Sequence, residues 1–333
     1  MQVEIISSAR LHLGFYAIST KNVAYGGIGV AIEKPHLIMQ VEESRGVQIE
    51  NLTSVHVEED VKKVIEWLDL PGAKVKVLEA IPRHVGLGST TQLRLSLAYA
   101  LSKIYNRKKS IRELAFIVKR GWISGIGIAA FEKGGFILDA GRIPENGKVS
   151  DPKGWKDLPF MMYRRTVPKN WLFLVALPEE STGLDEHEEK PLLENIEPNM
   201  RLERNLHEIV LLQMLPALVR RDIVRFGKAI TRLQILVGKY FAKYQDGEFC
   251  CFETENLVRH MLKKGAYGAG QSSWGPAAYG LIDSKKAVEL KEAVEKYVDR
   301  TGIKCKVFLT QVRNRGFSLK FIESKNYGYS AST

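Results

Sequence analysis

One stretch of the sequence is the most informative about the fold, Pro82-Arg83-His84-Val85-Gly86-Leu87-Gly88-Ser89-Thr90-Thr91-Gln92. Before it, residues 75–80 alternate apolar and polar side chains as in a strand, and after it residues 89–105 carry apolar side chains at helical spacing. The glycines therefore lie where a strand leads into a helix, with Ser89 as the expected N-cap. Glycine backbone and the free N–H groups of a helix N-terminus favour an anion, so the stretch predicts a phosphate-binding loop. A tight turn before a capped helix is the alternative for such a loop taken alone.

The residues on either side of this loop predict an α+β fold. In the first half we expect strands over 3–13, 26–32, 37–43, 75–80 and 134–139, with Pro35 ending the second strand, and helices over 58–70, 89–105 and 111–120. In the second half we expect strands over 171–177, 304–310 and 317–322, and helices over 201–220, 223–237, 253–264 and 285–300, with a loop over 265–275. Helices packed on a β-rich start are typical of that class.

A length of 333 residues is comfortable for two domains. A segment rich in Gly, Pro, Asp and Lys over 146–157 is the expected connection between them. We therefore predict a first domain over 1–157 that carries the phosphate loop, a second over 158–325, and a loose tail over 326–333.

The composition predicts a globular protein with anionic partners. Apolar residues make up 45% and charged residues 26% of the chain, and the net charge is +11. The basic residues are dispersed, which disfavours nucleic-acid binding. Three cysteines, two of them adjacent, have no metal-ligand spacing. No apolar stretch approaches the roughly 20 residues of a membrane helix, and the first strand lacks a basic lead-in, so we expect a cytoplasmic protein.

Three further glycine clusters accompany the phosphate loop. They lie over 10–14 with 25–29, over 120–127 with 131–135, and over 265–276. Such glycine density predicts backbone close to a ligand, with a glycine-rich hairpin or bulge as the alternative for the last cluster.

The four clusters, in content and in order, resemble the GHMP kinase superfamily, which includes galactokinase, homoserine kinase and mevalonate kinase. Residues 10–31 are similar to its N-terminal motif, residues 82–92 to its phosphate loop, and residues 268–275 to its C-terminal glycine motif. The resemblance implies a ribosomal-protein-S5-domain-2-like first domain and a ferredoxin-like second domain.

Within the superfamily the chain resembles an archaeal branch that serves methanopterin-type cofactor biosynthesis. The segments that carry this resemblance are 8–14, 25–31, 124–127 with 130–136, 226–238 and 270–276. It implies transfer of ribose 5-phosphate from phosphoribosyl pyrophosphate to 4-aminobenzoate or 4-hydroxybenzoate, with release of CO2 and pyrophosphate and with Mg²⁺.

The chain departs from the superfamily's kinases at one position. Those kinases commonly carry an S-G-x-D motif whose carboxylate accepts the proton of the acceptor hydroxyl, and the matching place in Ser124-Gly125-Ile126-Gly127 is Gly127. Glu132 lies about 7 Å further along if the segment is helical, too far for the same proton. If the ring carbon that bears the carboxylate attacks the sugar, CO2 leaves in place of a proton and no base is required. Glu132 is then a hypothetical electrostatic support for a developing oxocarbenium ion.

We predict a catalytic set and a binding set. Arg10 and His12 lie on one face of the first strand and join Glu132 in the catalytic set. A satisfied buried histidine is the alternative for His12. The phosphate and substrate set is Gly86, Leu87, Gly88, Ser89, Thr90, Gln92, Gly26, Gly27, Ser124, Gly125, Gly268, Gly270, Gln271, Ser272 and Ser273.

Three assignments stay open. Trp274 and Phe131 either stack on an aromatic acceptor or belong to the core. The acidic run over 179–180 and 185–189 is a solvated surface or a magnesium site. The oligomeric state is not fixed by any sequence feature, and a homodimer is one option.

Two other functions compete with the transferase. An ATP-dependent small-molecule kinase would need a base that Gly127 does not provide. A non-catalytic RNA-binding or regulatory protein follows from the relation of the first domain to a ribosomal protein, but dispersed basic residues and the four glycine clusters disfavour it.

Overall fold

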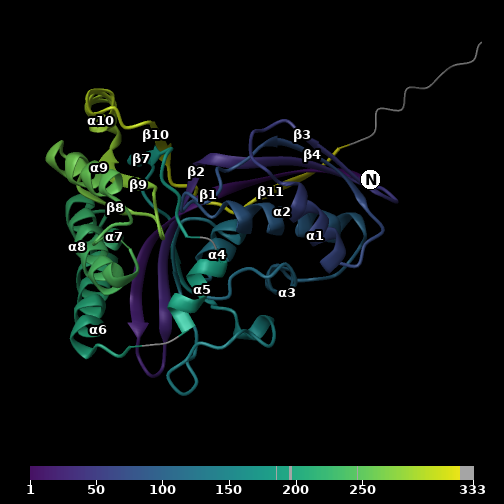
Figure 1. Ribbon diagram of the computed structural model, residues 1–333, viewed down its shortest axis with the longest axis horizontal. Coiled ribbons are helices and arrows are strands. Elements are labelled where there is room, and N and C mark those ends of the chain that lie inside the picture. Colours follow the sequence, from purple (N-terminus) through teal and green to yellow (C-terminus); the bar gives the residue numbers. More distant parts are fainter. Residues whose placement is uncertain (185, 195–196, 246, 323–333) are drawn as a thin grey trace, which may run out of the picture.

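The computed structural model describes residues 1–184, 186–194, 197–245 and 247–322, which form two β-sheets with helices packed against them (Figure 1). The architecture is α+β, as predicted. In the part of the chain so described, no helix is both long and apolar enough to cross a membrane. The predicted tail over 326–333 lies outside the described residues.

The first sheet is built around a long hairpin of β1 (Gln2–Ser19) and β2 (Ala24–Glu43). Its order is β11-β1-β2-β4-β3, and a branch from β2 adds β5 and then β6. The other strands are β3 (Val47–Asn51), β4 (Ala73–Glu79), β5 (Phe136–Asp139), β6 (Met161–Arg165) and β11 (Ser318–Ile322). The helices of this half are α1 (Glu58–Trp67), α2 (Ser89–Ile104), α3 (Ile111–Ile117) and α4 (Ile126–Glu132), and both α2 and α4 pack on β1 and β2.

The second sheet is antiparallel and has the order β10-β7-β9-β8. Its strands are β7 (Trp171–Pro178), β8 (Gly268–Gln271), β9 (Ala278–Asp283) and β10 (Cys305–Gln311). In chain order this is the arrangement 4-1-3-2 of a ferredoxin-like sheet, which confirms that prediction. The helices of this half are α5 (Glu186–Glu194), α6 (Met200–His207), α7 (Leu215–Arg220), α8 (Ile223–Phe241), α9 (Phe252–Lys263) and α10 (Ala287–Thr301). Helices α8, α9 and α10 pack on the second sheet, whereas α6 packs on β1 of the first.

Some predicted elements differ in detail. Strand β2 continues through Pro35, because the β1–β2 register shifts between Ser8 and Arg10 and the proline falls in that irregular part of the ladder. The predicted helix over 201–220 contains a π-helical turn at Glu208–Met214 between α6 and α7. The predicted loop over 265–275 contains the short strand β8.

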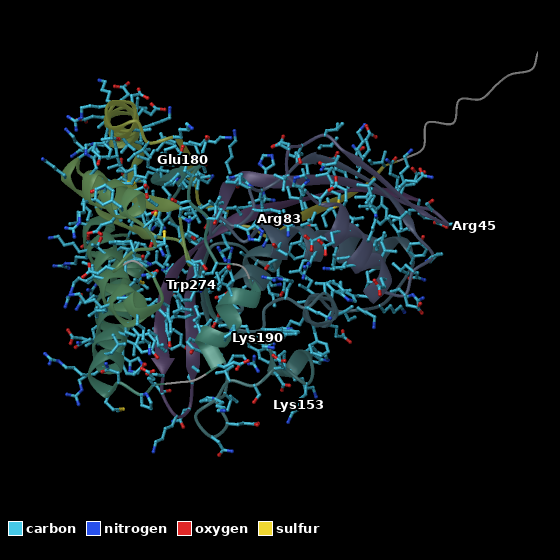
Figure 2. The ribbon with its side chains drawn as sticks, viewed as in Figure 1. Arg45, Arg83, Lys153, Glu180, Lys190 and Trp274 are labelled. Atoms are coloured by element: carbon cyan, nitrogen blue, oxygen red, sulfur yellow. The ribbon has the colours of Figure 1, made fainter. Side chains whose placement is uncertain are left out.

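The predicted boundary after residue 157 does not separate the sheets. Strand β6 pairs with β5, and β11 pairs with β1, so both belong to the first sheet although the boundary assigned them to the second domain. One hydrophobic cluster includes Val3 and Leu11 of the first half and Trp171 and Phe226 of the second. The two halves therefore share a continuous core, and in Figure 2 Trp274 and Lys190 lie between them while Arg45 lies at the far end of the first half.

Candidate active site

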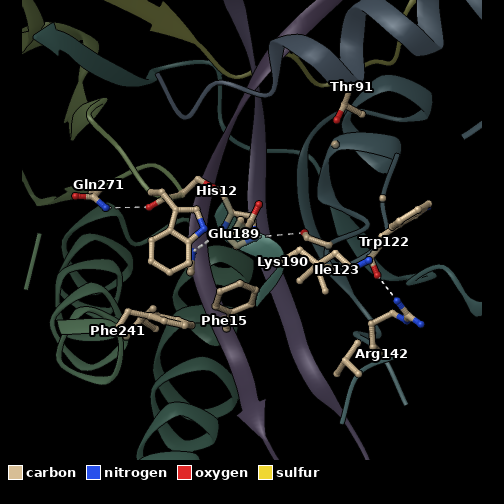
Figure 3. A pocket seen from close by; sticks show the side chains of 18 of the residues that line it. His12, Phe15, Thr91, Trp122, Ile123, Arg142, Glu189, Lys190, Phe241 and Gln271 are labelled. Carbon is tan, nitrogen blue, oxygen red and sulfur yellow. Dashed lines mark hydrogen bonds between the residues drawn. The ribbon is translucent and has the colours of Figure 1, made fainter. Parts of the chain in front are cut away.

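A cleft opens beside the β1–β2 hairpin, where segments from both halves of the chain meet (Figure 3). Its free volume, counted to its open mouth, is about 1300 Å³. Its lining includes Arg10, His12, Phe15, Thr91, Arg120, Trp122, Ser124, Gly127, Arg142, Asp151, Glu189, Lys190, Gln234, Phe241, Gln271, Ser273 and Trp274. Polar groups that converge between apolar walls are typical of a small-molecule site.

The cleft brings together only part of the predicted site. Among the predicted residues, it is lined by Arg10, His12, Ser124, Gln271 and Ser273. The lining does not include Glu132, Gly26, Gly27, Gly86, Leu87, Gly88, Ser89, Thr90, Gln92, Gly125, Gly268, Gly270 or Ser272. Several of these residues, among them Gly27, Gly86, Gly88 and Gly270, instead lie against side chains that line the cleft.

The predicted phosphate loop holds Arg10 and the segment after β8. Gly86 has φ +79°, and its carbonyl oxygen accepts hydrogen bonds from Arg10 Nη1 at 2.5 Å and from Ser272 Oγ at 2.6 Å. A Cβ atom at Gly86 would lie 2.1 Å from the Ser272 carbonyl, and one at Gly88 would lie 3.3 Å from the Arg10 side chain. The two glycines thus permit close approach by the protein itself and fix Arg10 at the cleft.

The start of α2 differs from the prediction. Gly88, in the left-handed conformation, is the N-cap, and Ser89 is the first helical residue. Ser89 and Thr90 line a separate, small apolar cavity together with Arg83 and Leu37. The next residue in the chain, Thr91, is the one that reaches the cleft.

A hydrogen-bonded chain of three side chains crosses the base of the cleft. The Gly14 amide donates to His12 Nδ1 at 3.3 Å, which places the proton on Nε2, 3.3 Å from Ser124 Oγ. Ser124 Oγ in turn donates to Asp139 Oδ2 at 3.1 Å. Burial lowers the pKa of His12 to about 3, with a further contribution from the charge of Arg10. His12 is therefore neutral at neutral pH, as the alternative reading of a satisfied buried histidine predicts.

Asp139, which the sequence analysis did not single out, anchors this chain. Its carboxylate accepts from the amides of Gly27 and Gly141 at 2.9 Å and of Gly125 at 2.7 Å, in addition to Ser124. Burial raises the pKa of Asp139, while these donors oppose the rise. A Cβ atom at Gly27 would lie 2.6 Å from Asp139 Oδ2, so this glycine makes room for the carboxylate.

The cleft is lined by four basic residues, Arg10, Arg120, Arg142 and Lys190, and by the acidic residues Asp151, Glu189, Glu194 and Glu248. Burial lowers the pKa of Arg10 to about 10, and the carboxylate of Glu189 opposes that effect. Arg10 is therefore charged at neutral pH. Arg120 Nε donates to Thr91 Oγ1 at 3.1 Å, and Arg142 donates to the Trp122 and Ser150 carbonyls. Clustered guanidinium groups of this kind suit phosphate oxygens.

The cleft also has an aromatic surface. Phe241 makes an edge contact with Trp274 at a ring-centroid distance of 5.1 Å, and Phe15 makes one with His12 at 4.9 Å. Figure 3 shows Phe15 and Phe241 on the same side of the cleft. These rings offer a flat apolar surface of the kind that holds an aromatic ligand. Trp274 thus lines the cleft and also packs within its wall.

Gly127, the position of the kinase carboxylate, lies in the cleft wall against α2. A Cβ atom here would lie 3.0 Å from Thr91 Cγ2 and 3.5 Å from Thr91 Oγ1. Gln92 Nε2 donates to the Gly127 carbonyl at 3.0 Å. At the position that the resemblance assigns to the kinase base, the neighbouring side chain is thus Thr91, which accepts a hydrogen bond from Arg120.

Glu132 and Phe131 do not contribute to the cleft. Glu132 ends α4, at the opposite end of this helix from Ser124, and forms an ion pair with Lys133 at 3.1 Å. Its predicted catalytic position is therefore wrong for this cleft. Phe131 stacks on Phe317 at a centroid distance of 4.4 Å and is fully buried, so it belongs to the core.

The remaining glycines mostly accommodate protein atoms. A Cβ atom at Gly270 would lie 2.4 Å from Gln234 Cγ, and one at Gly26 would lie 2.4 Å from the Tyr16 ring. At Gly268 it would lie 2.1 Å from the Gly227 carbonyl, where α8 crosses β8. The glycine density therefore reflects tight packing behind the cleft more than direct ligand contact.

Several lining residues escaped prediction. Arg120 and Trp122 stand in a glycine cluster that was noted, and a search for basic residues beside glycines would have found Arg120. No local sequence pattern marks the other lining residues as part of a site, since only the tertiary structure brings them to the cleft. These residues include Phe15, Arg142, Lys190 and Phe241. Of the acidic run, Glu189 lines the cleft, while Asp185 lies outside the described residues.

The described residues contain no group of three or more His, Cys, Asp or Glu side chains placed to hold a metal ion. Asp151 and Glu189 do line the cleft, and Asp151 Oδ2 pairs with Lys190 Nζ at 2.9 Å. Mg²⁺ is commonly held by one or two carboxylates together with substrate phosphates, and this donor set fits that mode of binding.

Sequence comparisons identify the family. Residues 55–135 match the family described as GHMP kinases N terminal domain, and residues 214–300 match GHMP kinases C terminal. A β-ribofuranosylphenol 5′-phosphate synthase of Methanothermobacter thermautotrophicus is 32% identical over 308 residues, which cover 86% of this chain and 91% of the relative. The chain belongs to the β-ribofuranosylphenol 5′-phosphate synthase family. A relative of the same name from Archaeoglobus fulgidus is 30% identical, covering 89% of this chain and 92% of the relative. The protein is thus an enzyme.

Solved structures show the same fold. Galactokinase of Lactococcus lactis, with galactose bound, superposes with a TM-score of 0.67 at 14% identity and covers 95% of both chains. Homoserine kinase of Cytophaga hutchinsonii gives a TM-score of 0.64 at 16% identity, covering 96% of this chain and 97% of its own. Both confirm the GHMP kinase-like fold.

Proposed function

We propose that the protein transfers ribose 5-phosphate from phosphoribosyl pyrophosphate to the carboxyl-bearing carbon of a 4-substituted benzoate. The anomeric C–O bond to pyrophosphate breaks, a C–C bond forms to the ring, and the carboxylate leaves as CO2. The relatives are named for a phenol product. We therefore propose 4-hydroxybenzoate as the acceptor, with 4-aminobenzoate as the competing one.

The two walls of the cleft support this assignment. The basic side chains that line the cleft, Arg10, Arg120, Arg142 and Lys190, suit the phosphates of the donor. Phe15, Phe241 and Trp274 offer an apolar surface for the ring of the acceptor. A site for this reaction must hold a highly anionic sugar beside a flat aromatic acid, and the cleft has both surfaces.

The observation that carries the proposal is Gly127. Hydroxyl phosphorylation needs a group to accept a proton, whereas attack by the carboxyl-bearing ring carbon restores aromaticity by losing CO2. The electron pair of the C–CO2⁻ bond returns to the ring, so no proton is removed from that carbon. Gly127, which packs on Thr91, offers no side chain that could accept a proton, and this suits the reaction that releases CO2.

His12 is proposed as a positioning residue. Ser124 Oγ receives the His12 N–H and donates to Asp139, so its hydroxyl is fully used within the protein. The chain from His12 to Asp139 ties β1 to the start of α4. It holds Arg10 on one side of the cleft and the segment that carries Arg120 on the other.

Magnesium is proposed to enter with the pyrophosphate group. Glu189 and Asp151 would complete its coordination, and it would neutralise charge on the departing pyrophosphate.

The predicted cytoplasmic location and the homodimer stay predictions.

The test is a product assay with purified enzyme, Mg²⁺, phosphoribosyl pyrophosphate and carboxyl-labelled 4-hydroxybenzoate or 4-aminobenzoate. We expect equal release of labelled CO2 and pyrophosphate, faster with the hydroxy acid. Phenol, which lacks the carboxylate, should not react, because its ring carbon would have to lose a proton. Absence of both products with either acid would refute the proposal. Formation of ADP from ATP with a small alcohol would favour the kinase.

A further inference from the structure

Two adjacent thiols lie beside the active-site cleft without a role in the proposed reaction. Cys250 and Cys251 precede α9, with their Sγ atoms 3.5 Å apart. Thr254 Oγ1 lies 3.5 Å from the first sulfur and 3.2 Å from the second. Both cysteines are half-buried and carry free thiols. The pair is therefore accessible in part and close enough for reaction between the sulfurs.

The two sulfurs are chemically unequal. The Cys250 thiol donates a hydrogen bond to Cys251, and this bond lowers the pKa of Cys251 to about 6 although burial opposes it. The same bond, with burial, raises the pKa of Cys250 far above its ordinary value. Cys251 is also the N-cap of the 12-residue helix α9, where the helix dipole favours a thiolate. The hydrogen bond and the helix N-terminus therefore favour the thiolate form of Cys251 over that of Cys250.

The pair contacts the segment that forms one wall of the cleft. The Cys250 amide donates to Gln271 Oε1 at 2.7 Å, and Gln271 Nε2 donates to the Ser273 carbonyl at 3.0 Å. A Cβ atom at Gly275 would lie 2.4 Å from Cys250 Sγ. Thr254 Oγ1 donates to the Pro276 carbonyl at 2.8 Å. The Cys250 sulfur thus packs against the segment 271–276, which carries Trp274.

We propose that Cys250 and Cys251 form a reversible modification site for two-electron oxidants of the hydroperoxide class. The Cys251 thiolate attacks the peroxide, an S–O bond forms, the O–O bond breaks, and the alcohol leaves with a proton from water. The Cys250 sulfur then attacks the Cys251 sulfenic acid. The S–O bond breaks, a disulfide forms, and the Cys250 proton leaves with the hydroxide as water.

Oxidation would change the wall of the cleft. The sulfurs would close from 3.5 Å to a disulfide length of about 2.05 Å. Adjacent Cα atoms are about 3.8 Å apart, shorter than the usual Cα separation across a disulfide, so the bond would be strained and easily reduced. The contacts with Thr254 and the support beneath Gly275 would shift with it.

The test treats the whole enzyme with tert-butyl hydroperoxide and follows intact mass and alkylation of thiols. We expect the loss of two hydrogen atoms and protection of Cys250 and Cys251 from alkylation, with full recovery in dithiothreitol. Burial raises the pKa of Cys305 to about 12, and C305S is the matched control that should oxidise like the wild type. This chemical measurement requires no substrate and is independent of the proposed reaction.

The cysteine variants separate the two roles. C250S should stop at a sulfenic acid that dimedone traps, and C251S and C251A should resist oxidation at this site. Oxidation of C251S or C251A at the wild-type rate, or sulfinic acid as the main wild-type product, would overturn the proposal. In the product assay, oxidised wild type should lose at least about tenfold in rate and regain it on reduction, because small displacements at a site have such effects. Full activity of the disulfide form would refute the link to the cleft.

Discussion

At the scale of single residues, the shape of the cleft wall depends on a position that has no side chain. Gly127 has no Cβ atom, and the space beside it is occupied by Thr91, which receives a hydrogen bond from Arg120. The sequence resemblance predicted that Gly127 stands where the kinases carry a carboxylate. It could not reveal Thr91 as the neighbour, because that contact joins the starts of two helices far apart in the chain.

The first prediction concerns Gly127. G127D would force a carboxylate against Thr91 and should lower the rate at least about tenfold, equivalent to about 1.4 kcal/mol of barrier. G127A is the matched control, since its single methyl group would lie 3.0 Å from Thr91 Cγ2 and requires a shift of only a few tenths of an ångström. Rates of CO2 release measure both. Equal rates for G127D and wild type would contradict the proposed fit.

The second prediction concerns the pH dependence of stability. The pKa of His12 is lowered from 6.5 to about 3 in the folded protein, so between these values the unfolded chain binds the extra proton. The stabilising effect of neutral His12 is complete above pH 6.5 and is lost as the pH falls through that window, by up to about 1.4 kcal/mol per pH unit. Urea unfolding of wild type and H12N at pH 7, 6 and 5 measures it. H12N should show the shallower loss, and the exposed-histidine variant H56N should match the wild type. Parallel curves for wild type and H12N would contradict the assignment.

At the scale of elements, local patterns were reliable where they were long. The strand before the phosphate loop and the helix after it were predicted because alternation and helical spacing extend over many residues. The short α4 and β6 were missed, since a few residues hold too little periodicity. Pro35 was misjudged because its effect depends on the ladder register of a partner strand.

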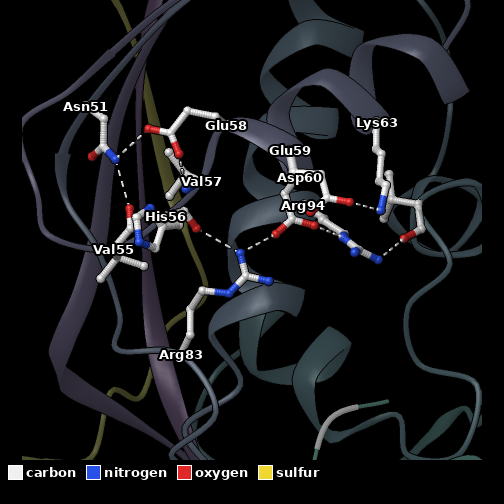
Figure 4. A network of polar contacts seen from close by, with 11 residues as sticks. Asn51, Val55, His56, Val57, Glu58, Glu59, Asp60, Lys63, Arg83 and Arg94 are labelled. Atoms are coloured by element: carbon white, nitrogen blue, oxygen red, sulfur yellow. Dashed lines mark hydrogen bonds and ion pairs between the residues drawn. The ribbon is translucent and has the colours of Figure 1, made fainter. Parts of the chain in front are cut away.

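The polar network beside the loop shows how α1 and α2 are held together (Figure 4). Asp60 of α1 accepts from Arg83 at 2.7 Å and from Arg94 of α2 at 2.6 Å, and Asp60 is 3% exposed. Arg94 also lies over the Trp67 ring. Asp60 thus fixes the phosphate loop, through Arg83, to both helices.

The third prediction follows from that network. D60N leaves two guanidinium groups without their carboxylate and should lower the free energy of unfolding by about 3 kcal/mol. The matched control on the same helix is E59Q, which removes an exposed pair with Lys63 and should leave the melting temperature almost unchanged. Thermal and urea unfolding test both. A D60N melting temperature equal to that of E59Q would show that the network does not stabilise the fold.

At the scale of the whole molecule, the cleft exists because two sheets meet. Its basic and aromatic walls come from segments that the sequence could not place together, such as Arg142, Lys190 and Phe241. The family resemblance correctly indicated both domain types and the enzyme class. It could not indicate that the glycines of the motifs pack mainly on other protein atoms, because these are tertiary contacts such as that of Gly86 with the Ser272 carbonyl.

The fourth prediction concerns the junction of the halves. Gln234 of α8 donates to the Leu13 carbonyl at 2.7 Å and accepts from the Gln271 amide at 2.8 Å. Q234A would leave two buried backbone groups without partners and should lower stability by about 1–3 kcal/mol for each. Q40A, which removes a part-buried side-chain contact with Glu4, is the control and should change stability by about 0.5 kcal/mol or less. Urea unfolding compares them, and equal effects would contradict the bridging role.

The return of β11 to the first sheet governs how this enzyme can be recombined with its relatives. Ser318–Ile322 pairs with the first residues of the chain, from Gln2 to Ile6, so the ferredoxin-like part enters and leaves the same sheet. A chimera joined once, near residue 157, would combine β1 with a foreign β11 and leave β6 on the wrong parent. Exchange of an internal block between β6 and β11 keeps every pairing of the first sheet within one parent. In protein engineering, the part of the chain between β6 and β11 should therefore be exchanged as one internal block that is joined to the other parent at both of its ends.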